Sequence, residues 1–595
     1  MREYSVPASY TVPDDVSMAD SVFTYAQDTP SWVPFQRRSG SAFVDVTAKQ
    51  FAEEVAAAAK GLMASGIEFG DRVAILSATR YEWVVLDYAI WTAGACTVSI
   101  YETSAADQAS WILEDSATKL LIVETNDHLE RVKEVTEKAE ALRETLVIDG
   151  GAVDELVTRG RSVSDEDLHA RRKQVTASSA ATLIYTSGTT GRPKGVQLTH
   201  GNFYAETSAT QVALHDQMTE GKRTLLFLPM AHVFARAVSF GAFEAKVTVA
   251  HTSDTTTLVE QFAEFQPDFI LSVPRVFEKV YNSAKQKAHD GGKGKIFDQA
   301  AEVAIEWSTA QDTGGAGLGL KLKHALFDKL VYSKLRAALG GKCQSALSGG
   351  GPLGARLGHF FRGIGVPVRE GYGLTETSAA VTVNTTDKQR IGSVGRPLAG
   401  HAVKIAEDGE VLVQGPVVFS GYWHNDKATE ESIRDGWFHT GDIGSLDDEG
   451  FLSITGRKKE IIVTAGGKNV APAGLEDAIR SHPLVSQCLV VGDAKPFIGA
   501  LITLDPEALP GWLERHGLDK ETPASELTTN SDLVAEIDAA VASANSKVSN
   551  AEQIKKYTIL PGDFTIESGE LTPTMKLKRN VILESHAKEV SEIYG

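Results

Sequence analysis

Short apolar runs alternate with amphipathic helical segments along the first half of the chain, and this alternation limits the fold more than any other feature. Residues 48–65 carry apolar side chains at helical spacing, and Gly66 follows as a stop signal. The apolar runs at 73–76 and 97–100 predict strands. Because strands that alternate with helices build parallel sheets covered on both faces, we expect an α/β fold.

The same pattern predicts several further elements. A helix is expected at 82–92, another from a cap at Ser104 to about Asp115, and a charged one at 127–142. Further strands are expected at residues 120–123, 146–148, 181–184, 224–228, 247–250 and 269–271.

Length, charge and cysteine content narrow the class of protein. At 595 residues the chain is too long for a single hydrophobic core, so two or more domains are expected. A net charge of −19 argues against nucleic acid as a partner, since nucleic-acid binding needs a basic surface. Cys96, Cys343 and Cys488 lack metal-binding spacing, which predicts buried thiols in a reducing compartment. No apolar run is long enough to span a bilayer and no signal pattern opens the chain, so we expect a cytoplasmic protein.

The segment 185–195 reads Tyr-Thr-Ser-Gly-Thr-Thr-Gly-Arg-Pro-Lys-Gly and combines four Ser/Thr hydroxyls, three glycines and one lysine. Glycines let the backbone close around a ligand and turn its N–H groups inward, and hydroxyls add short donors. Lys194 supplies a positive charge, so the segment suits a polyphosphate. Its spacing differs from that of a Walker loop. A polar surface loop is the alternative interpretation.

A second glycine-rich segment, 348–354, follows further along the chain. Gly349, Gly351 and Gly354 satisfy the dinucleotide pattern, and Glu370 stands where a ribose-binding acid would be, which keeps an NAD-linked oxidoreductase open. Pro352 fits the first turn of a helix expected at 355–361, so a glycine loop would enter a helix in either case.

Residues 370–377 read Glu-Gly-Tyr-Gly-Leu-Thr-Glu-Thr after a short strand expected at 366–368. Tyr372 offers a flat face to an adenine ring, and Glu376 offers a carboxylate to a magnesium ion that holds phosphates. Two more segments complete the set, Asp-Gly-Trp-Phe-His-Thr-Gly-Asp at 435–442 and Gly-Arg-Lys-Lys-Glu-Ile-Ile-Val-Thr-Ala-Gly-Gly-Lys-Asn-Val-Ala-Pro at 456–472.

These segments occur in the order of the signatures of the adenylate-forming superfamily, which includes acyl-CoA synthetases, luciferases and peptide-synthetase adenylation domains. The chain resembles that superfamily over essentially its whole length. The resemblance implies a large N-terminal domain of parallel and mixed sheets with helices on both faces, and a smaller, mobile α+β C-terminal domain. It also implies two half-reactions: a carboxylate and ATP give an acyl-adenylate and pyrophosphate, and a thiol then displaces AMP.

The resemblance also assigns the parts of ATP and its metal ion. The phosphates would lie against Thr186, Ser187, Gly188, Thr189, Thr190, Gly191 and Lys194, with Thr189 counted among the catalytic residues. The adenosine would lie near Gly349, Gly350, Gly351, Glu370, Gly371, Tyr372, Gly373 and Thr375. Glu376, helped by Thr186, would hold Mg²⁺. Asp442 and Arg457 would contact the ribose, because a carboxylate accepts from both hydroxyls and an arginine adds a fixed fork of donors.

Residues 571–579, Leu-Thr-Pro-Thr-Met-Lys-Leu-Lys-Arg, resemble the catalytic-lysine segment of the superfamily. Aligning Arg579 with the family's basic residue three places on assigns the catalytic role to Lys576, with Lys578 as a solvated neighbour. A cation near the α-phosphate and the attacking carboxylate stabilises the transition state more than the ground state.

The resemblance divides the chain into an N-terminal domain at 1–456 and a mobile C-terminal domain at 457–595. Lys459 matches the hinge position between them. Gly466 and Gly467 would let the pantetheine of coenzyme A pass close to the backbone in the second half-reaction. A charged linker without a special role is the alternative.

Within the superfamily, the wording at 228–232 and 272–279 and the insertion at about 284–342 resemble bacterial long-chain fatty acid-CoA ligases. The resemblance puts His232 near the substrate carboxylate as a catalytic residue; a core or surface histidine is the alternative. We therefore expect a fatty acid, ATP, Mg²⁺ and coenzyme A as ligands. No carrier domain is evident, yet a fatty acyl-AMP ligase that serves a carrier protein remains an alternative.

The insertion at 284–342 is basic in an acidic protein, with ten Lys and Arg against six Asp and Glu. Its residues 321–339 predict one amphipathic helix, on one side of which we expect Leu322, Leu326, Leu330, Val331 and Leu335. Such a helix either packs on its own domain with its lysines in water or lies on an anionic membrane, here the inner face. The sequence is compatible with a monomer or a homodimer.

Overall fold

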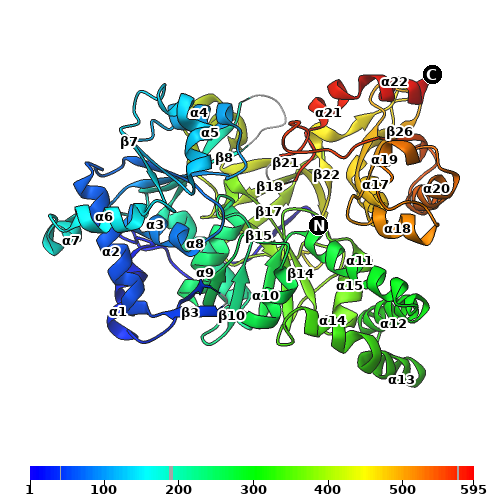
Figure 1. Ribbon diagram of the computed structural model, residues 1–595, viewed down its shortest axis with the longest axis horizontal. Helices are drawn as coiled ribbons and strands as arrows, with labels where there is room; N and C mark the ends of the chain where they lie inside the picture. Colours follow the sequence, from blue (N-terminus) through cyan, green and yellow to red (C-terminus); the bar gives the residue numbers. More distant parts are fainter. Residues whose placement is uncertain (41, 187–191, 573–574) are drawn as a thin grey trace.

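The structure is a computed structural model that describes residues 1–40, 42–186, 192–572 and 575–595. A large N-terminal part built of several sheets carries a smaller C-terminal part at one end (Figure 1). The buried apolar residues of the large part form two clusters, the larger of which runs as far as Leu452. A separate cluster begins at Ile462 in the small part, which contains a second cluster as well. The expected α/β architecture with a smaller α+β C-terminal unit is confirmed.

The largest sheet has seven strands in the order β19-β9-β8-β5-β4-β6-β7. Its parallel strands are β4 (Arg72–Leu76), β5 (Cys96–Ile100), β6 (Leu120–Val123), β7 (Glu144–Val147) and β8 (Ala180–Thr186). Strand β9 (Lys194–Thr199) runs antiparallel to β8, and β19 (Gly421–Tyr422) runs antiparallel to β9 at the edge of the sheet. The expected helices are present as α2 (Ala48–Ala64) and α3 (Tyr81–Thr92), and all but one residue of α3 is buried in the core.

Two helix boundaries in this region differ from expectation. Helix α4 (Ala106–Asp115) begins after Ala105, because Ser104 belongs to the preceding turn, where its N–H donates to the Tyr101 carbonyl. The charged helix α5 spans Asn126–Thr136 and so ends before 142. Ala139 and Leu142 still pack on the same apolar cluster as Val132, but from the turn that follows the helix.

A second sheet positions the glycine-rich segments. Its parallel strands are β12 (Phe269–Ser272), β13 (Ser345–Ser348) and β14 (Val368–Leu374). Strand β15 (Ala379–Val383) runs antiparallel to β14, and β16 (Arg396–Pro397) runs antiparallel to β15. Parallel strands place their carboxyl ends at one edge, where ligands of such sheets bind. Strand β14 begins at Val368 and contains 370–374, so the strand expected at 366–368 begins later and continues through the motif. Helix α15 (Ala355–Gly363) begins after Gly354, so Pro352 precedes the helix and its first turn.

The remaining sheets complete the two parts. A four-stranded sheet contains β10 (Arg223–Leu226), β11 (Thr248–His251), β2 (Phe35–Ser39) and β3 (Ala42–Val46). A six-stranded one contains β1 (Glu3–Ser5), β17 (Ala402–Ile405), β18 (Glu410–Gln414), β20 (Ile433–Arg434), β21 (Trp437–Leu446) and β22 (Leu452–Arg457). The small part contains β25 (Val485–Val491), β26 (Ile498–Leu504), β27 (Ile554–Ile559), α17 (Pro472–Arg480) and α20 (Ser531–Asn545).

The insertion forms α11 (Pro274–Asp290), α12 (Gly294–Asp312), α13 (Leu318–Phe327), a π-helical turn η1 (Asp328–Tyr332) and α14 (Ser333–Ala338). The single helix expected at 321–339 is therefore interrupted by the π turn. The shared face expected for its apolar residues is also wrong: Leu335 is buried, whereas Leu322, Leu326 and Leu330 face outward. The π turn adds a residue to the spiral and so rotates the two halves relative to each other.

Two simple expectations can also be compared with the structure. No helix of the described residues is long and apolar enough to cross a membrane. All three cysteines are buried free thiols, as their spacing predicted.

Candidate active site

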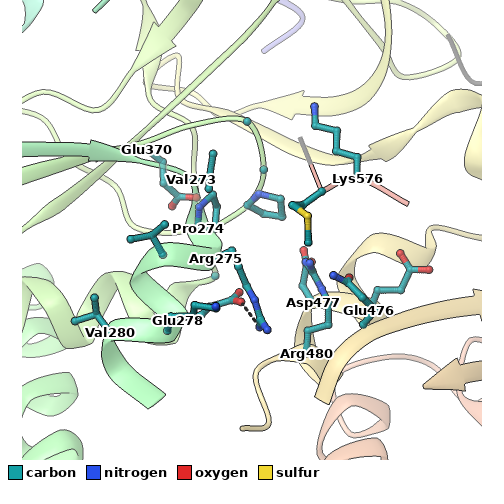
Figure 2. A pocket seen from close by; sticks show the side chains of 18 of the residues that line it. Val273, Pro274, Arg275, Glu278, Val280, Glu370, Glu476, Asp477, Arg480 and Lys576 are labelled. Atoms are coloured by element: carbon teal, nitrogen blue, oxygen red, sulfur yellow. Dashed lines mark hydrogen bonds and ion pairs between the residues drawn. The ribbon is translucent and has the colours of Figure 1, made fainter. Parts of the chain in front are cut away.

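A cavity of about 2140 Å³ lies where the carboxyl ends of β12, β13 and β14 face the small C-terminal part. Figure 2 shows Val273, Pro274 and Glu370 on one side of it, and Asp477, Arg480 and Lys576 on the other. Many of the residues expected at the active site line this one cavity: His232, Gly350, Gly351, Glu370, Gly371, Tyr372, Gly373, Asp442, Arg457 and Lys576.

An aspartate in the cavity wall forms an ion pair with an arginine and accepts a hydrogen bond from a tyrosine. Asp442 of β21 lies opposite Arg457 of β22 in the strand register, and its Oδ1 lies 3.0 Å from the Arg457 Nε. The Tyr372 hydroxyl donates to the other oxygen, Oδ2, at 2.6 Å. Burial raises the pKa of Asp442, while the charge of Arg457 opposes that rise. Two oxygens of a carboxylate are thus fixed in orientation, which suits recognition of a pair of hydroxyls.

Tyr422 connects the expected phosphate and metal residues. Its hydroxyl donates to the Glu376 Oε1 at 2.9 Å, and the Lys194 Nζ lies 4.8 Å from the centre of its ring. Lys194 of β9 lies directly opposite Thr186 of β8 in the strand register. The carboxylate, the lysine and the threonine therefore gather at one place. Ser187, Gly188, Thr189, Thr190 and Gly191 lie outside the described residues. Tyr422 was not expected from the sequence, because an aromatic residue in a strand of two residues carries no signal of its own.

The glycine loop after β13 is fastened to β14. The Glu370 Oε1 accepts a hydrogen bond from the Leu353 N–H at 2.9 Å, and burial raises the pKa of Glu370 to about 6. This carboxylate therefore holds the loop that contains Gly349. Gly373 is required by strand packing, since a Cβ there would lie 1.4 Å from the Ala379 carbonyl oxygen, beside the bulge in the β14–β15 pair. Thr375 follows β14 as the first residue of the 3₁₀ turn Thr375–Thr377.

Lys576 enters the cavity from the C-terminal part. A bridge between Leu571 and Leu577 forms a tight loop around it, and its own N–H donates to the Thr572 Oγ1 at 3.0 Å. Although the side chain still reaches solvent, loss of hydration in the cleft lowers the pKa of Lys576, and the Arg457 charge lowers it further. The carboxylates of Asp442, Glu376 and Glu460 act in the opposite direction.

The segment around Lys576 is anchored by a neighbouring arginine. Arg579 pairs with Glu476 of α17 at 2.5 Å and with Glu460 at 3.5 Å, and it donates to the Val490 carbonyl. Lys576 lines the cavity, as do Leu577 and Arg579, whereas Lys578 does not. Lys578 is half-buried rather than fully in solvent.

His232 precedes helix α9 (Val233–Glu244), and its Nδ1 accepts the Phe234 N–H at 3.1 Å. Burial lowers the pKa of His232 to about 3, and the Lys576 charge contributes. The imidazole is therefore neutral near pH 7 and can act as a hydrogen-bond partner rather than a cation. Beside it the cavity wall is apolar and includes Phe227, Leu228, Val259, Phe262 and Val273.

Several expected residues do not line the cavity. Its lining lacks Thr186, Lys194, Gly349, Thr375 and Glu376, and three more residues lie in the small part. Gly466 and Gly467 are exposed at the tip of the hairpin of β23 (Ile462–Val463) and β24 (Asn469–Val470). Lys459 is exposed in the 3₁₀ turn Lys458–Glu460. Its neighbour Lys458 pairs with Asp408 and Glu410 of the large part.

Ion pairs join the two parts beside the cavity. Arg275 and Lys279 of α11 bind Asp505 and Glu507 of the small part, both at 2.8 Å. A third pair, Asp290 with Arg515, is 3.4 Å long. The sequence analysis missed all three pairs, because residues more than 200 positions apart leave no local pattern.

The fold and the site are those of an adenylating enzyme, and the chain belongs to the AMP-binding enzyme family. The profile of that family matches residues 23–423, and the profile of the AMP-binding enzyme C-terminal domain matches 459–595.

Individual relatives match along the whole chain. The long-chain-fatty-acid–CoA ligase FadD15 of Mycobacterium bovis is 55% identical over 598 residues, which cover 100% of both chains. Its counterpart from Mycobacterium tuberculosis is 54% identical with the same coverage. The long-chain-fatty-acid–CoA ligase ACSBG2 of Xenopus laevis is 31% identical over 95% of this chain and 82% of its own.

Solved structures agree with the fold. The anthranilate CoA ligase AuaEII, in complex with anthranoyl-AMP, superposes with a TM-score of 0.73 at 19% identity, covering 98% of this chain and 99% of its own. The O-succinylbenzoate coenzyme A synthetase MenE of Bacillus subtilis, in complex with ATP and magnesium, gives 0.67 at 23% identity, covering 94% and 98%. The family expected from the sequence motifs is confirmed.

Proposed function

We propose that this chain activates long-chain fatty acids: ATP and the fatty acid form an acyl-adenylate, and coenzyme A then takes the acyl group as a thioester. The chain is a long-chain fatty acid-CoA ligase, an AMP-forming acid-thiol ligase. One observation carries the proposal: Lys576 enters, from the small part, the cavity that holds the Asp442–Arg457 pair. The full-length match to FadD15, whose name states this activity, supports it.

The nucleotide would bind with its ribose on Asp442 and Arg457 and its base between Tyr372 and the loop at 349–351. In the structure Tyr372 already fixes Asp442, so the carboxylate is oriented before the ribose arrives. An orientation set in advance reduces the entropy lost on binding. The phosphates would extend toward Thr186 and Lys194.

Glu376 and Thr186 offer the hard oxygen ligands that Mg²⁺ prefers. No cluster of three or more His, Cys, Asp or Glu suited to a metal occurs among the described residues, so phosphate oxygens and water would complete the coordination. When bound, the ion neutralises phosphate charge. The MenE structure with ATP and magnesium is the related example that supports this assignment.

Lys576 would stabilise the charge that develops as the fatty acid carboxylate attacks the α-phosphorus and pyrophosphate leaves. His232, kept neutral by its surroundings, would orient the attacking carboxylate from the opposite wall. The apolar part of the cavity wall, which includes Phe227, would bind the alkyl chain. Burial of each methylene there contributes about 0.8 kcal/mol to the binding free energy.

The thiol step requires a second arrangement of the small part, because Gly466 and Gly467 face solvent here. The chain turns from one part to the other at Lys458–Glu460, with Lys459 as the proposed hinge between domains at 1–456 and 457–595. Rotation about such a short turn would move Lys576 out of the cavity and bring the hairpin of Gly466 and Gly467 to it. We propose a cytoplasmic location, since ATP and coenzyme A would be the substrates.

A screen of pyrophosphate release over fatty, aromatic and amino acids, with and without coenzyme A, tests the proposal. Long-chain fatty acids should give the fastest release, and acyl-CoA should accumulate only when coenzyme A is present. Adenylate that persists with coenzyme A as sole acceptor would favour the ligase that serves a carrier protein. A nicotinamide absorbance change without ATP would instead favour the oxidoreductase.

A further inference from the structure

Helix α13 presents a row of leucines to solvent. Leu318 is 80% exposed, Leu322 is 74% and Leu326 is 57%, and Leu330 in the π turn that follows is 48% exposed. No large apolar side chain elsewhere in the described part of the chain is as exposed as the first three. The helix has no buried residue. An unpaired apolar row of this length marks a surface that is covered by something in its working state.

The opposite face of α13 attaches it to the protein. His324 stacks on Trp307 of α12 with ring centres 4.3 Å apart, and its Nε2–H donates to the Gly363 carbonyl at 2.7 Å. At roughly 100° per residue, Leu322 and Leu326 point away from His324. The leucines therefore do not hold the helix in place. Figure 1 shows α13 at the outer edge of the molecule, beyond α12.

Lysines flank the leucine row. Residues 318–339 contain five Lys and Arg and a single Asp, in a protein of net charge −19. The one acid, Asp328, is paired with Arg336 at 2.7 Å. Among the described residues, no ion pair is formed by the exposed lysines of this stretch: Lys321, Lys323, Lys329 and Lys334. The surface is thus apolar along its centre and positive along its edges.

The catalytic cavity extends to the base of this surface. Leu330, Val331 and Lys334 line the same cavity as Lys576, and so does Ile296 of α12, which is 44% exposed. The cavity that contains Lys576 therefore extends to the leucine row, with both apolar and lysine side chains in its lining there.

We propose that α13 docks this protein on an anionic lipid surface, with Leu318, Leu322 and Leu326 among the acyl chains and the flanking lysines at the headgroups. A bilayer offers apolar depth and negative charge in the same plane, which matches both parts of the surface. Docking there brings the cavity entrance to the phase in which long-chain acyl groups dissolve. The delivery of substrate rests on the proposed function, whereas the docking itself does not.

Co-sedimentation of the full-length protein with vesicles tests the docking without any catalytic step. Vesicles of phosphatidylglycerol and phosphatidylcholine should bind the protein, vesicles of phosphatidylcholine alone should bind it far less, and added salt should weaken binding. Each lysine near an anionic surface contributes about fivefold in affinity, so Lys321→Glu with Lys323→Glu should lower it by about 25-fold or more. Leu322→Glu with Leu326→Glu should abolish it. These side chains are exposed, so the variants should keep the wild-type thermal unfolding curve.

Matched controls lie on other faces. Val212→Glu replaces a 54% exposed valine of α8 (His200–Ala213) and should leave vesicle binding unchanged, as should Lys133→Glu with Lys138→Glu near α5. The proposal is overturned by equal binding to neutral and anionic vesicles, by no binding at all, or by α13 variants that bind like the controls. A dimer in sedimentation equilibrium that Leu322→Glu with Leu326→Glu dissociates would overturn it in favour of a second copy of the chain.

Discussion

Replacing Lys576 with alanine tests the assignment of the catalytic cation. Lys576 lines the cavity, and Lys578, two residues further on, does not. Lys578→Ala is the control, because it removes one ammonium group from the same segment and so reports the effects of charge and folding alone. Lys576 reaches solvent, and the fold of its loop rests on Arg579, which the variant leaves intact.

The expected loss follows from the charges around the cavity. Two unit charges about 4 Å apart attract by roughly 4 kcal/mol when the effective dielectric constant is about 20. Asp442, Glu376 and Glu460 already attract Lys576 in the resting site, so only the charge that develops in the transition state counts. Removing one such donor typically costs about 3–4 kcal/mol, or about 10²–10³ in the adenylation rate.

The assay separates the two half-reactions. Pyrophosphate release reports adenylation, and conversion of supplied acyl-AMP by coenzyme A reports thioester formation. Lys576→Ala should lose the first and keep the second, while Lys578→Ala should keep both. Equal losses in both half-reactions, or an equal cost of the two variants, would refute the reasoning.

The pH dependence of adenylation gives a second test of Lys576. Loss of hydration and the Arg457 charge lower its pKa below that of an ordinary lysine, and only the protonated form carries the useful charge. The rate should therefore fall as the pH rises through this lowered pKa. Lys576→Arg should move the alkaline limb to higher pH, because a guanidinium stays charged there. A limb at the same pH in the arginine variant would exclude Lys576 as its source.

Three further variants address other parts of the site. Tyr372→Phe frees the Asp442 carboxylate that the hydroxyl now holds at 2.6 Å, and it should raise the KM for ATP about tenfold with little change in kcat; an unchanged KM would contradict this. Asp505→Asn breaks the half-buried pair with Arg275 and should slow adenylation relative to thioester formation about fivefold in single-turnover assays, whereas Glu507→Gln at the exposed Lys279 pair should not. Lys459→Pro should spare pyrophosphate release but impair thioester formation, and unaltered thioester kinetics would count against the hinge.

Sequence reasoning succeeded where residue types follow from local rules. The apolar run at 181–184 became the buried strand β8, because continuous apolar runs are typical of parallel strands. Register distinguishes Lys576 from Lys578, and only Lys576 of the two lines the cavity; its catalytic role stays a prediction. Sequence reasoning failed for Tyr422 and for the Arg275–Asp505 pair, because their contacts join segments that are far apart in the chain. Sequence reasoning also failed for the leucines of α13, because the helical period does not reveal the π turn that places Leu335 on another face.

The way the two parts are joined explains how the small part could move. Their apolar cores remain separate, and the contacts that cross beside the cavity include three ion pairs, those of Arg275, Lys279 and Asp290. Partly exposed ion pairs contribute about 0–1 kcal/mol each, so together they hold the observed orientation by at most a few kcal/mol. A ligand that binds one orientation better than the other by a similar amount would shift the equilibrium. Conversion of ATP into acyl-AMP and pyrophosphate changes the charge next to Lys576 and Arg457, which is the kind of difference that could release the small part for the second half-reaction.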